Sequence, residues 1–277
     1  MSHIPKAEYA RRRKALMAQM VPNSIAILPA AAVAIRNRDV EHVYRQDSDF
    51  QYLSGFPEPE AVIVLIGGRR KRSILFCRDK NEEREVWEGF RYGPDAARDA
   101  FGFDEAYSFS SFESMLPELI ANHKALWYAL GHDTAWDAKV VAALNSVRAQ
   151  ARAGKHAPSK IRDLRQPLDR MRLVKDAHEI DLMRRAADIT SAGHARAMRH
   201  CRPGQAEYEL EAELTHEFRR RGAGGHSYNP IVAGGANACV LHYVDNDKLL
   251  AEHALVLIDA GCELEGYAAD ITRTFPV

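Results

Sequence analysis

Two aspartates near the end of the sequence carry its strongest chemical signal. Asp259 ends the apolar run 255–258, and Asp270 follows two alanines near the start of a second predicted strand, 268–275. Aspartate is depleted in strands and costly to bury. If the two strands pair across the glycine-containing turn between them, the carboxylates lie side by side on one face. They then need a shared proton or a cation between them. The alternative is that both aspartates cap a solvent-exposed turn.

A third candidate is His242, in the short apolar run 240–243, which we predict to be a strand. Most histidines in such runs are hydrogen-bonded core residues, and the neighbours at 228–230 together with the glycine-rich stretch at 234–237 raise the chance of a functional role here. The glycine stretch fits neither the P-loop nor the dinucleotide pattern and predicts a tight turn beside a pocket. No H-E-x-x-H, G-x-S-x-G or Cys/His zinc spacing occurs in the sequence.

Composition gives no sign of nucleic-acid binding, membrane-surface binding or a membrane span. The 277 residues carry 38 basic and 38 acidic side chains, so net charge gives no indication of nucleic-acid or membrane-surface binding. We interpret the basic runs 11–13 and 69–72 as solvated faces. No stretch approaches the roughly 20 apolar residues of a membrane span. Four scattered cysteines without a C-x-x-C pair predict free thiols and a cytoplasmic protein.

The elements that must position these residues fall into two groups. The front half mixes strands with helices, which predicts an α/β domain. Its strands are predicted at 24–28, 61–66, 73–77 and 125–130, and its helices at 7–20, 94–101, 111–121 and 135–150. The polar stretch 153–158 marks the boundary between domains at 1–160 and 171–277. The back half has helices at 176–200 and 205–221, followed by strands at 231–233, 240–243, 254–259 and 268–275.

Several segments together resemble one protein family. Segments 227–232, 237–243, 257–261 and 270–276 are similar, in this order, to the pita-bread metallopeptidases, and 171–180 resembles the entry to that domain. In the front half, 44–56 and 85–89 resemble the N-terminal domain of bacterial aminopeptidase P. The resemblance implies a creatinase/prolidase-type α/β front domain followed by the first half of an α+β pita-bread domain.

The resemblance also implies a chemistry. Asp259 and Asp270 would be two of five protein ligands to two metal ions, usually manganese, with Asp270 bridging both. A hydroxide between the ions would attack the peptide bond before a proline in second position. His242 would contact substrate and stabilise the transition state, and Tyr228 would belong to the substrate-binding residues. Proline supplies no N–H, so a specific site must recognise ring shape and the free amino terminus.

The front half would contribute to substrate binding through Asp39, Trp87 and Arg152. In the resembled family such residues reach an active site, often that of a neighbouring subunit, so a homo-oligomer of the full-length form is expected. One histidine and two glutamate ligands of the family follow its second aspartate, and the sequence reaches Val277 without supplying them. We therefore expect a fragment without appreciable activity of its own. The alternatives are a prolidase and a non-catalytic binding or oligomerisation module.

Overall fold

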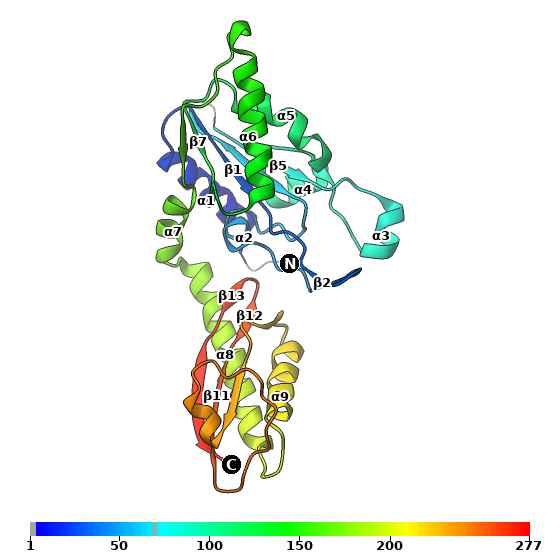
Figure 1. The fold of residues 1–277 in the computed structure, drawn as a ribbon, viewed down its shortest axis with the longest axis vertical. Coiled ribbons are helices and arrows are strands. Elements are labelled where there is room, and N and C mark those ends of the chain that lie inside the picture. Colours follow the sequence, from blue (N-terminus) through cyan, green and yellow to red (C-terminus); the bar gives the residue numbers. More distant parts are fainter. Residues whose placement is uncertain (1–3, 69–70) are drawn as a thin grey trace. The chain divides into compact units, whose positions relative to one another are not determined.

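The computed structural model describes residues 4–68 and 71–277 (Figure 1). These residues form two compact units, Ile4–Val174 and Lys175–Val277. The division, between Val174 and Lys175, lies a few residues beyond the interval expected between the domains 1–160 and 171–277, because α7 (Arg165–Leu173) belongs to the front unit. Leu164 and Leu168 are fully buried in the front core. No helix among the described residues is long and apolar enough to cross a membrane.

The front unit is built on a six-stranded mixed sheet in the order β6-β5-β4-β1-β7-β8. Its strands are β1 (Ser24–Pro29), β4 (Val62–Ile66), β5 (Arg72–Cys77), β6 (Glu105–Ser108), β7 (Ala125–Trp127) and β8 (Lys160–Arg162). The pairs β1/β4 and β4/β5 are antiparallel, the latter forming the predicted hairpin. The pairs β1/β7, β5/β6 and β7/β8 are parallel.

Helices cover both faces of this sheet, which is why every residue of β4 is buried. Because side chains alternate along a strand, Ile63 and Leu65 enter one core, while Val62 and Val64 enter the other. The first core is covered by α1 (Lys6–Gln19), α2 (Ser48–Ser54), α4 (Pro94–Phe101) and α7 (Arg165–Leu173). The second is covered by α5 (Phe112–Ile120) and α6 (Thr134–Ala149).

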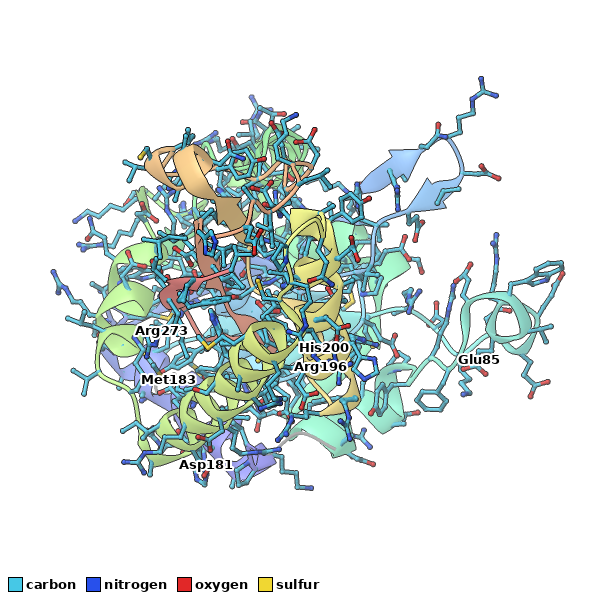
Figure 2. The ribbon with its side chains drawn as sticks, turned by 90° about the horizontal axis from the view of Figure 1, so that it is seen from below. Glu85, Asp181, Met183, Arg196, His200 and Arg273 are labelled. Carbon is cyan, nitrogen blue, oxygen red and sulfur yellow. The ribbon has the colours of Figure 1, made fainter. Side chains whose placement is uncertain are left out.

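Two segments project from the body of the front unit. One is the hairpin of β2 (Ile35–Asn37) and β3 (Val40–Glu41); the other is α3 (Glu82–Glu88), on which Glu85 is labelled (Figure 2). Both carry exposed apolar side chains, and Trp87 is 84% exposed. Short 3₁₀ turns, η1 (Phe109–Ser111) and η2 (Ala151–Ala153), complete the unit.

The basic run 11–13 is not a solvated face, contrary to the sequence-based interpretation. Arg13 is 1% exposed and donates hydrogen bonds to the carbonyl oxygens of Leu53 at 2.9 Å and Phe101 at 3.1 Å. Its guanidinium carbon lies 3.9 Å from the centroid of the Phe103 ring. Burial lowers the pKa of Arg13 to about 10. Consecutive helical residues are about 100° apart, so three arginines in a row cannot share one face.

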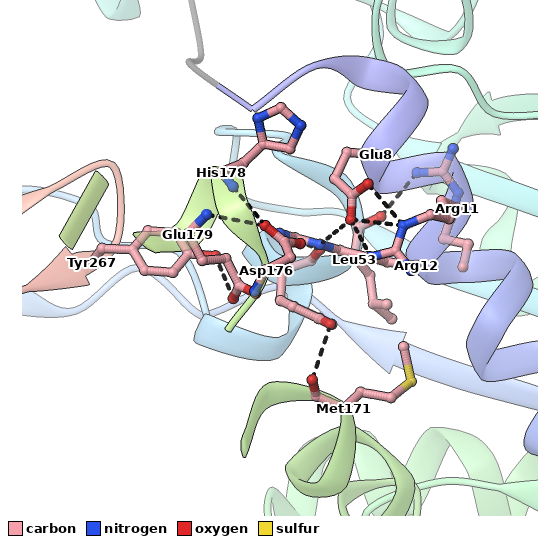
Figure 3. Close-up of polar contacts among 11 residues, drawn as sticks. Glu8, Arg11, Arg12, Leu53, Met171, Asp176, His178, Glu179 and Tyr267 are labelled. Carbon is pink, nitrogen blue, oxygen red and sulfur yellow. Dashed lines mark hydrogen bonds and ion pairs between the residues drawn. The ribbon is translucent and has the colours of Figure 1, made fainter. Parts of the chain in front are cut away.

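Arg12 is also buried, whereas the described residues of the second basic run, 69–72, are exposed. Arg12 donates to the carbonyl oxygen of Tyr52 at 3.2 Å and to the Glu8 carboxylate at 3.2 Å (Figure 3). Of the run 69–72, Lys71 and Arg72 are exposed, as expected of a solvated face, and the other two positions lie outside the described residues.

The back unit begins with two helices, α8 (Ala177–His200) and α9 (Glu207–Arg220), which pack together. A capping box fixes the start of α8: Asp176 accepts from the Glu179 N–H at 3.0 Å, and Glu179 accepts from the Asp176 N–H at 2.9 Å (Figure 3). The Tyr267 hydroxyl donates to the same Glu179 carboxylate at 3.0 Å. This contact ties the later hairpin to the start of α8.

Two three-stranded antiparallel sheets follow, ordered β10-β11-β14 and β13-β12-β9. Their strands are β9 (Gly225–His226), β10 (Ile231–Gly234), β11 (Leu255–Ala260), β12 (Cys262–Leu264), β13 (Tyr267–Ala268) and β14 (Ile271–Pro276). The expected turn between the aspartate-bearing strands is thus a β12–β13 hairpin belonging to the other sheet. Strands β11 and β14 nevertheless pair directly, as predicted.

The strand predicted at 240–243 is absent: these residues form a bend and turn after η3 (Gly235–Cys239). Val240 is 55% and Leu241 is 88% exposed, so this apolar run enters no core. Four residues are too few for periodicity to distinguish a strand from an exposed apolar turn.

Candidate functional site

Asp259 and Asp270 lie together at one end of the β11–β14 pair. Asp259 is opposite Thr272 in the antiparallel register, and Asp270 precedes Thr272 by two residues, so both aspartates belong to the same face. The hydroxyl oxygen of Tyr228 is within hydrogen-bonding distance of both carboxylates, at 3.1 Å from Oδ1 of Asp270. The structure therefore brings together three residues that lie in separate segments of the sequence.

Tyr228 acts as the donor in this cluster. Burial raises the pKa of the Tyr228 hydroxyl well above its usual value, and the neighbouring Asp259 and Asp270 carboxylates raise it further. The phenol therefore keeps its proton, which one carboxylate accepts at a time because a hydroxyl has a single hydrogen. Asp259 is half-buried and Asp270 is exposed, so the pair is open to solvent on the Asp270 side.

Hydrogen bonds behind the carboxylates hold their two backbone segments together. The Ser227 hydroxyl lies 2.9 Å from the carbonyl oxygen of Gly261 and 3.0 Å from that of Ala269. The Ala269 N–H donates to the Cys262 carbonyl at 3.0 Å. These contacts fix the residues just after Asp259 to the residue just before Asp270.

Helix α8 supports the same region from the protein interior. The hydroxyl oxygen of Thr190 accepts from the Cys262 N–H at 3.1 Å, and His194 Nε2 lies 3.1 Å from the Ala260 carbonyl oxygen. Both side chains are buried, and burial lowers the pKa of His194. A neutral His194 donates one N–H to this carbonyl, which helps to fix the end of β11.

The donor set fits a hard cation only in part. Carboxylate oxygens are the ligands that manganese, magnesium and calcium prefer, and Asp259 and Asp270 present such oxygens side by side. The described residues contain no group of three or more His, Cys, Asp or Glu side chains that could hold a metal ion. Two carboxylates alone give fewer protein ligands than a tight divalent site requires.

His242 occupies the turn after η3 and is exposed. Its neighbour Tyr243 donates to the Glu207 carboxylate at 2.7 Å. The sequence-based interpretation assigned no role to Glu207. The signal that could have found it is helical spacing, because Glu207 precedes Leu210 and Leu214 by three and seven residues on α9, and all three are fully buried in the structure.

The three front-unit candidates all lie on exposed segments. Asp39 is in the turn between β2 and β3, Trp87 is on α3, and Arg152 is in η2. The structure places them on three separate elements of the front unit, and their roles in binding are proposals.

Comparison with known proteins agrees with this architecture. The family described as aminopeptidase P, N-terminal domain, matches residues 9–127, and metallopeptidase family M24 matches residues 181–277. The Xaa-Pro aminopeptidase of Escherichia coli K12 is 46% identical over 100% of this chain and 63% of its own length.

Solved structures give the same result. Aminopeptidase PepP of Pseudomonas aeruginosa matches with a TM-score of 0.97 and 54% identity, covering 100% of this chain and 63% of that one. A zinc-substituted E. coli aminopeptidase P in complex with product matches with a TM-score of 0.97 and 46% identity, covering 99% and 63%. The chain thus spans 63% of the length of these relatives. With an aminopeptidase P front domain followed by M24 metallopeptidase residues, the chain belongs to the aminopeptidase P family of metallopeptidases.

Proposed function

We propose that this chain serves the metal-dependent removal of the N-terminal residue from peptides with proline in second position. The observation that carries the proposal is the contact of the Tyr228 hydroxyl with both Asp259 and Asp270. Two adjacent carboxylates on a solvent-accessible edge are suited to hold cations, and their oxygen donors suit manganese. Zinc is the metal named for the solved E. coli relative, so both metals belong in the test.

Each residue of the back unit has a distinct task in this proposal. Asp259 and Asp270 would hold the metal ions, two per complete site, which supply Lewis acidity toward the peptide carbonyl and toward water. Tyr228 would orient whichever of the two carboxylates accepts its hydroxyl proton. The exposed imidazole of His242 would donate a hydrogen bond to the carbonyl oxygen as negative charge develops on it.

Substrate selection would draw on the exposed candidates of the front unit. The ring of Trp87 offers an apolar face of the kind that packs against a proline ring. Asp39 supplies a negative charge suited to a free amino terminus, and Arg152 supplies a positive charge suited to a peptide carboxylate. We propose these three as substrate-binding residues, with a homo-oligomer as the functional form.

The test compares this chain with a chimera that continues into the remaining part of the E. coli relative. Both are assayed with manganese or zinc on an Xaa-Pro-Xaa tripeptide, an Xaa-Pro dipeptide and an Xaa-Ala-Xaa tripeptide. We expect the chimera to cleave the Xaa-Pro tripeptide and the 277-residue chain to show no appreciable turnover. In the chimera, Asp270→Asn should abolish kcat, because a lost ligand removes transition-state stabilisation.

Three other results of this assay would contradict parts of the proposal. Preference of the chimera for the Xaa-Pro dipeptide would replace the proposed activity by that of a prolidase. A folded chimera without turnover on any substrate, in either metal, would contradict an enzymatic role and favour a binding module. Equal turnover by the chain and the chimera would show that the described residues already complete the site.

A further inference from the structure

One buried carboxylate on α9 holds the segment that carries His242. Glu207 is fully buried. Its Oε1 accepts hydrogen bonds from the Gly234 N–H at 2.7 Å and the Asn237 side-chain amide at 2.9 Å. Its Oε2 accepts from the Tyr243 hydroxyl at 2.7 Å and the Lys248 N–H at 3.1 Å. All four donors belong to the segment 234–248, and they flank His242 on both sides.

The segment and the carboxylate depend on each other. A buried carboxylate without donors is costly, and so are backbone N–H groups without acceptors. The Glu207 N–H also donates to the Lys248 carbonyl oxygen at 2.9 Å, so Glu207 and Lys248 each donate a hydrogen bond to the other. Glycine at 234 leaves room for this approach, because a Cβ there would lie 2.9 Å from the Leu250 side chain and 3.4 Å from Glu207 Oε1.

A second tie from α9 reaches the same segment. The side-chain amide of buried Asn246 donates to Glu211 at 2.8 Å and accepts from the Val232 N–H at 2.9 Å. Its backbone has a φ of 48°, a left-handed conformation that asparagine tolerates. The segment is therefore held at its two ends and near Asn246, while the turn that carries His242 remains exposed.

We propose that Glu207 is a positioning residue for His242, which it holds in place through the hydrogen bond of the adjacent Tyr243 and through both ends of segment 234–248. The proposal rests on the proposed function only for the role given to His242. An exposed imidazole has few contacts of its own to orient it, so its place follows from its backbone. Glu207 does not touch the substrate in this proposal; it acts through His242.

The substitution Glu207→Gln distinguishes a carboxylate requirement from simple packing. Glutamine has the same shape but replaces one carboxylate oxygen by an NH₂ group. This NH₂ group is a donor, and it would face groups that themselves donate to Glu207. If the NH₂ group faces Tyr243, the phenol can turn to accept, but the Lys248 N–H loses its acceptor. If it faces Asn237, that amide can turn, but the Gly234 N–H loses its acceptor. Either orientation leaves one backbone N–H unpaired.

The experiment uses the 277-residue chain without metal or substrate. Amide hydrogen exchange is measured at Gly234 and Lys248, and ¹³C-histidine NMR reports the ring of His242. In Glu207→Gln we expect exchange at one of the two amides to accelerate about tenfold or more, because an unpaired amide opens more readily. The His242 signal should shift or broaden, while that of His200, at the end of α8, stays unchanged.

Two further variants make the result decisive. Tyr243→Phe removes one donor and keeps both backbone bonds, so it should change the His242 signal without altering exchange at Gly234; it decides the matter if Glu207→Gln does not fold. Glu213→Gln is the matched control, because Glu213 is also on α9 but pairs with Arg196. We expect wild-type exchange and a wild-type His242 signal in this control.

Unchanged exchange and an unchanged His242 signal in both Glu207→Gln and Tyr243→Phe would overturn the proposal. So would an equal change of the His242 signal in Glu213→Gln, which would indicate a general loosening of the unit. None of these readouts needs turnover, so the two proposals can fail separately. An inactive chimera would contradict the proposed function but not the positioning role of Glu207. Unchanged exchange and NMR signals beside an active chimera would contradict the positioning role but not the proposed function.

Discussion

The carbonyl oxygen of Ala269 lies 1.7 Å from the position that a Cβ on Gly261 would occupy. No side chain fits there, so glycine is required by close backbone approach and not by an unusual φ angle. The same two residues are bridged by the Ser227 hydroxyl. The distance between the segments carrying Asp259 and Asp270 is therefore set by a backbone contact immediately behind them.

Gly261→Ala should destabilise the back unit by about 3 kcal/mol, at the upper end of overpacking costs, because backbone atoms must move to admit the methyl group. Amide hydrogen exchange in β11 and β14 measures this change. Gly224→Ala is the control, since the nearest atom to its Cβ would be 3.5 Å away, and we expect a change within about 0.5 kcal/mol. Equal effects of the two substitutions would disprove the steric argument.

Arg13→Lys should destabilise the front unit by about 2–3 kcal/mol at pH 7, because lysine cannot reach carbonyls on two different segments with one ammonium group. All three tryptophans of the sequence, Trp87, Trp127 and Trp136, lie in the front unit. Urea unfolding followed by tryptophan fluorescence therefore reports this unit selectively. Exposed Arg11→Lys should change the free energy of unfolding by no more than about 0.5 kcal/mol; a matching loss there would mean that burial of Arg13 is not the cause.

Periodic patterns made most of the fold predictable. The strands at 62–66 and 72–77 and the helix at 94–101 follow from apolar runs bounded by glycine and proline. The pairing of β11 with β14 was also predictable, because an aspartate at the end of an apolar strand is unusual enough to demand an explanation. In the structure both aspartates lie on one face of this pair, which is the first of the two alternatives that the sequence leaves open.

Features that depend on tertiary contacts could not be predicted in the same way. The run 240–243 looks like a strand, yet its last residue, Tyr243, donates a hydrogen bond to Glu207, which precedes it by 36 residues. Arg13 looks like a surface cation because only the folded chain brings the Leu53 and Phe101 carbonyls to it. Both errors involve a charged side chain that is buried with its partners, which composition and periodicity do not detect.

The stability of the back unit should fall below about pH 6.5, in part because of His226. Burial lowers the pKa of His226, with the Glu211 carboxylate opposing the effect. The folded pKa is thus below the unfolded value of about 6.5. The neutral ring therefore contributes stability that is present above about pH 6.5 and is lost as pH falls through the folded pKa.

His226→Asn should flatten this pH dependence between about pH 6.5 and 5. Urea unfolding followed by circular dichroism measures it, with the front-unit transition assigned from tryptophan fluorescence. Removal of the ring also costs the contact with Thr215 at 2.7 Å, so the slope with pH, not the absolute stability, is the quantity to compare. His216→Asn, at an exposed position on α9, should keep the wild-type slope; an unchanged slope in His226→Asn would exclude His226 as the source.

The 277-residue chain should bind manganese only weakly. Asp259 and Asp270 supply two carboxylates, and no group of three metal-binding side chains occurs among the described residues. Manganese is low in the divalent affinity order, so we expect a dissociation constant of about 1 mM. At about 1 mM manganese such a site stabilises the folded state by only about 0.4 kcal/mol. Electron paramagnetic resonance measures the binding, because free Mn²⁺ gives a sharp signal that weakens when the ion is bound.

Asp259→Asn should weaken this binding further, because an amide oxygen carries no net charge to offset that of the ion. Asp181→Asn removes an exposed carboxylate on α8 (Figure 2) and should leave the titration unchanged, which separates the site from general surface attraction. Saturation at about 10 μM manganese would contradict the prediction. It would mean that further ligands complete the site, and a mixture of wild-type and Asp259→Asn chains would then test whether a second copy of the chain supplies them.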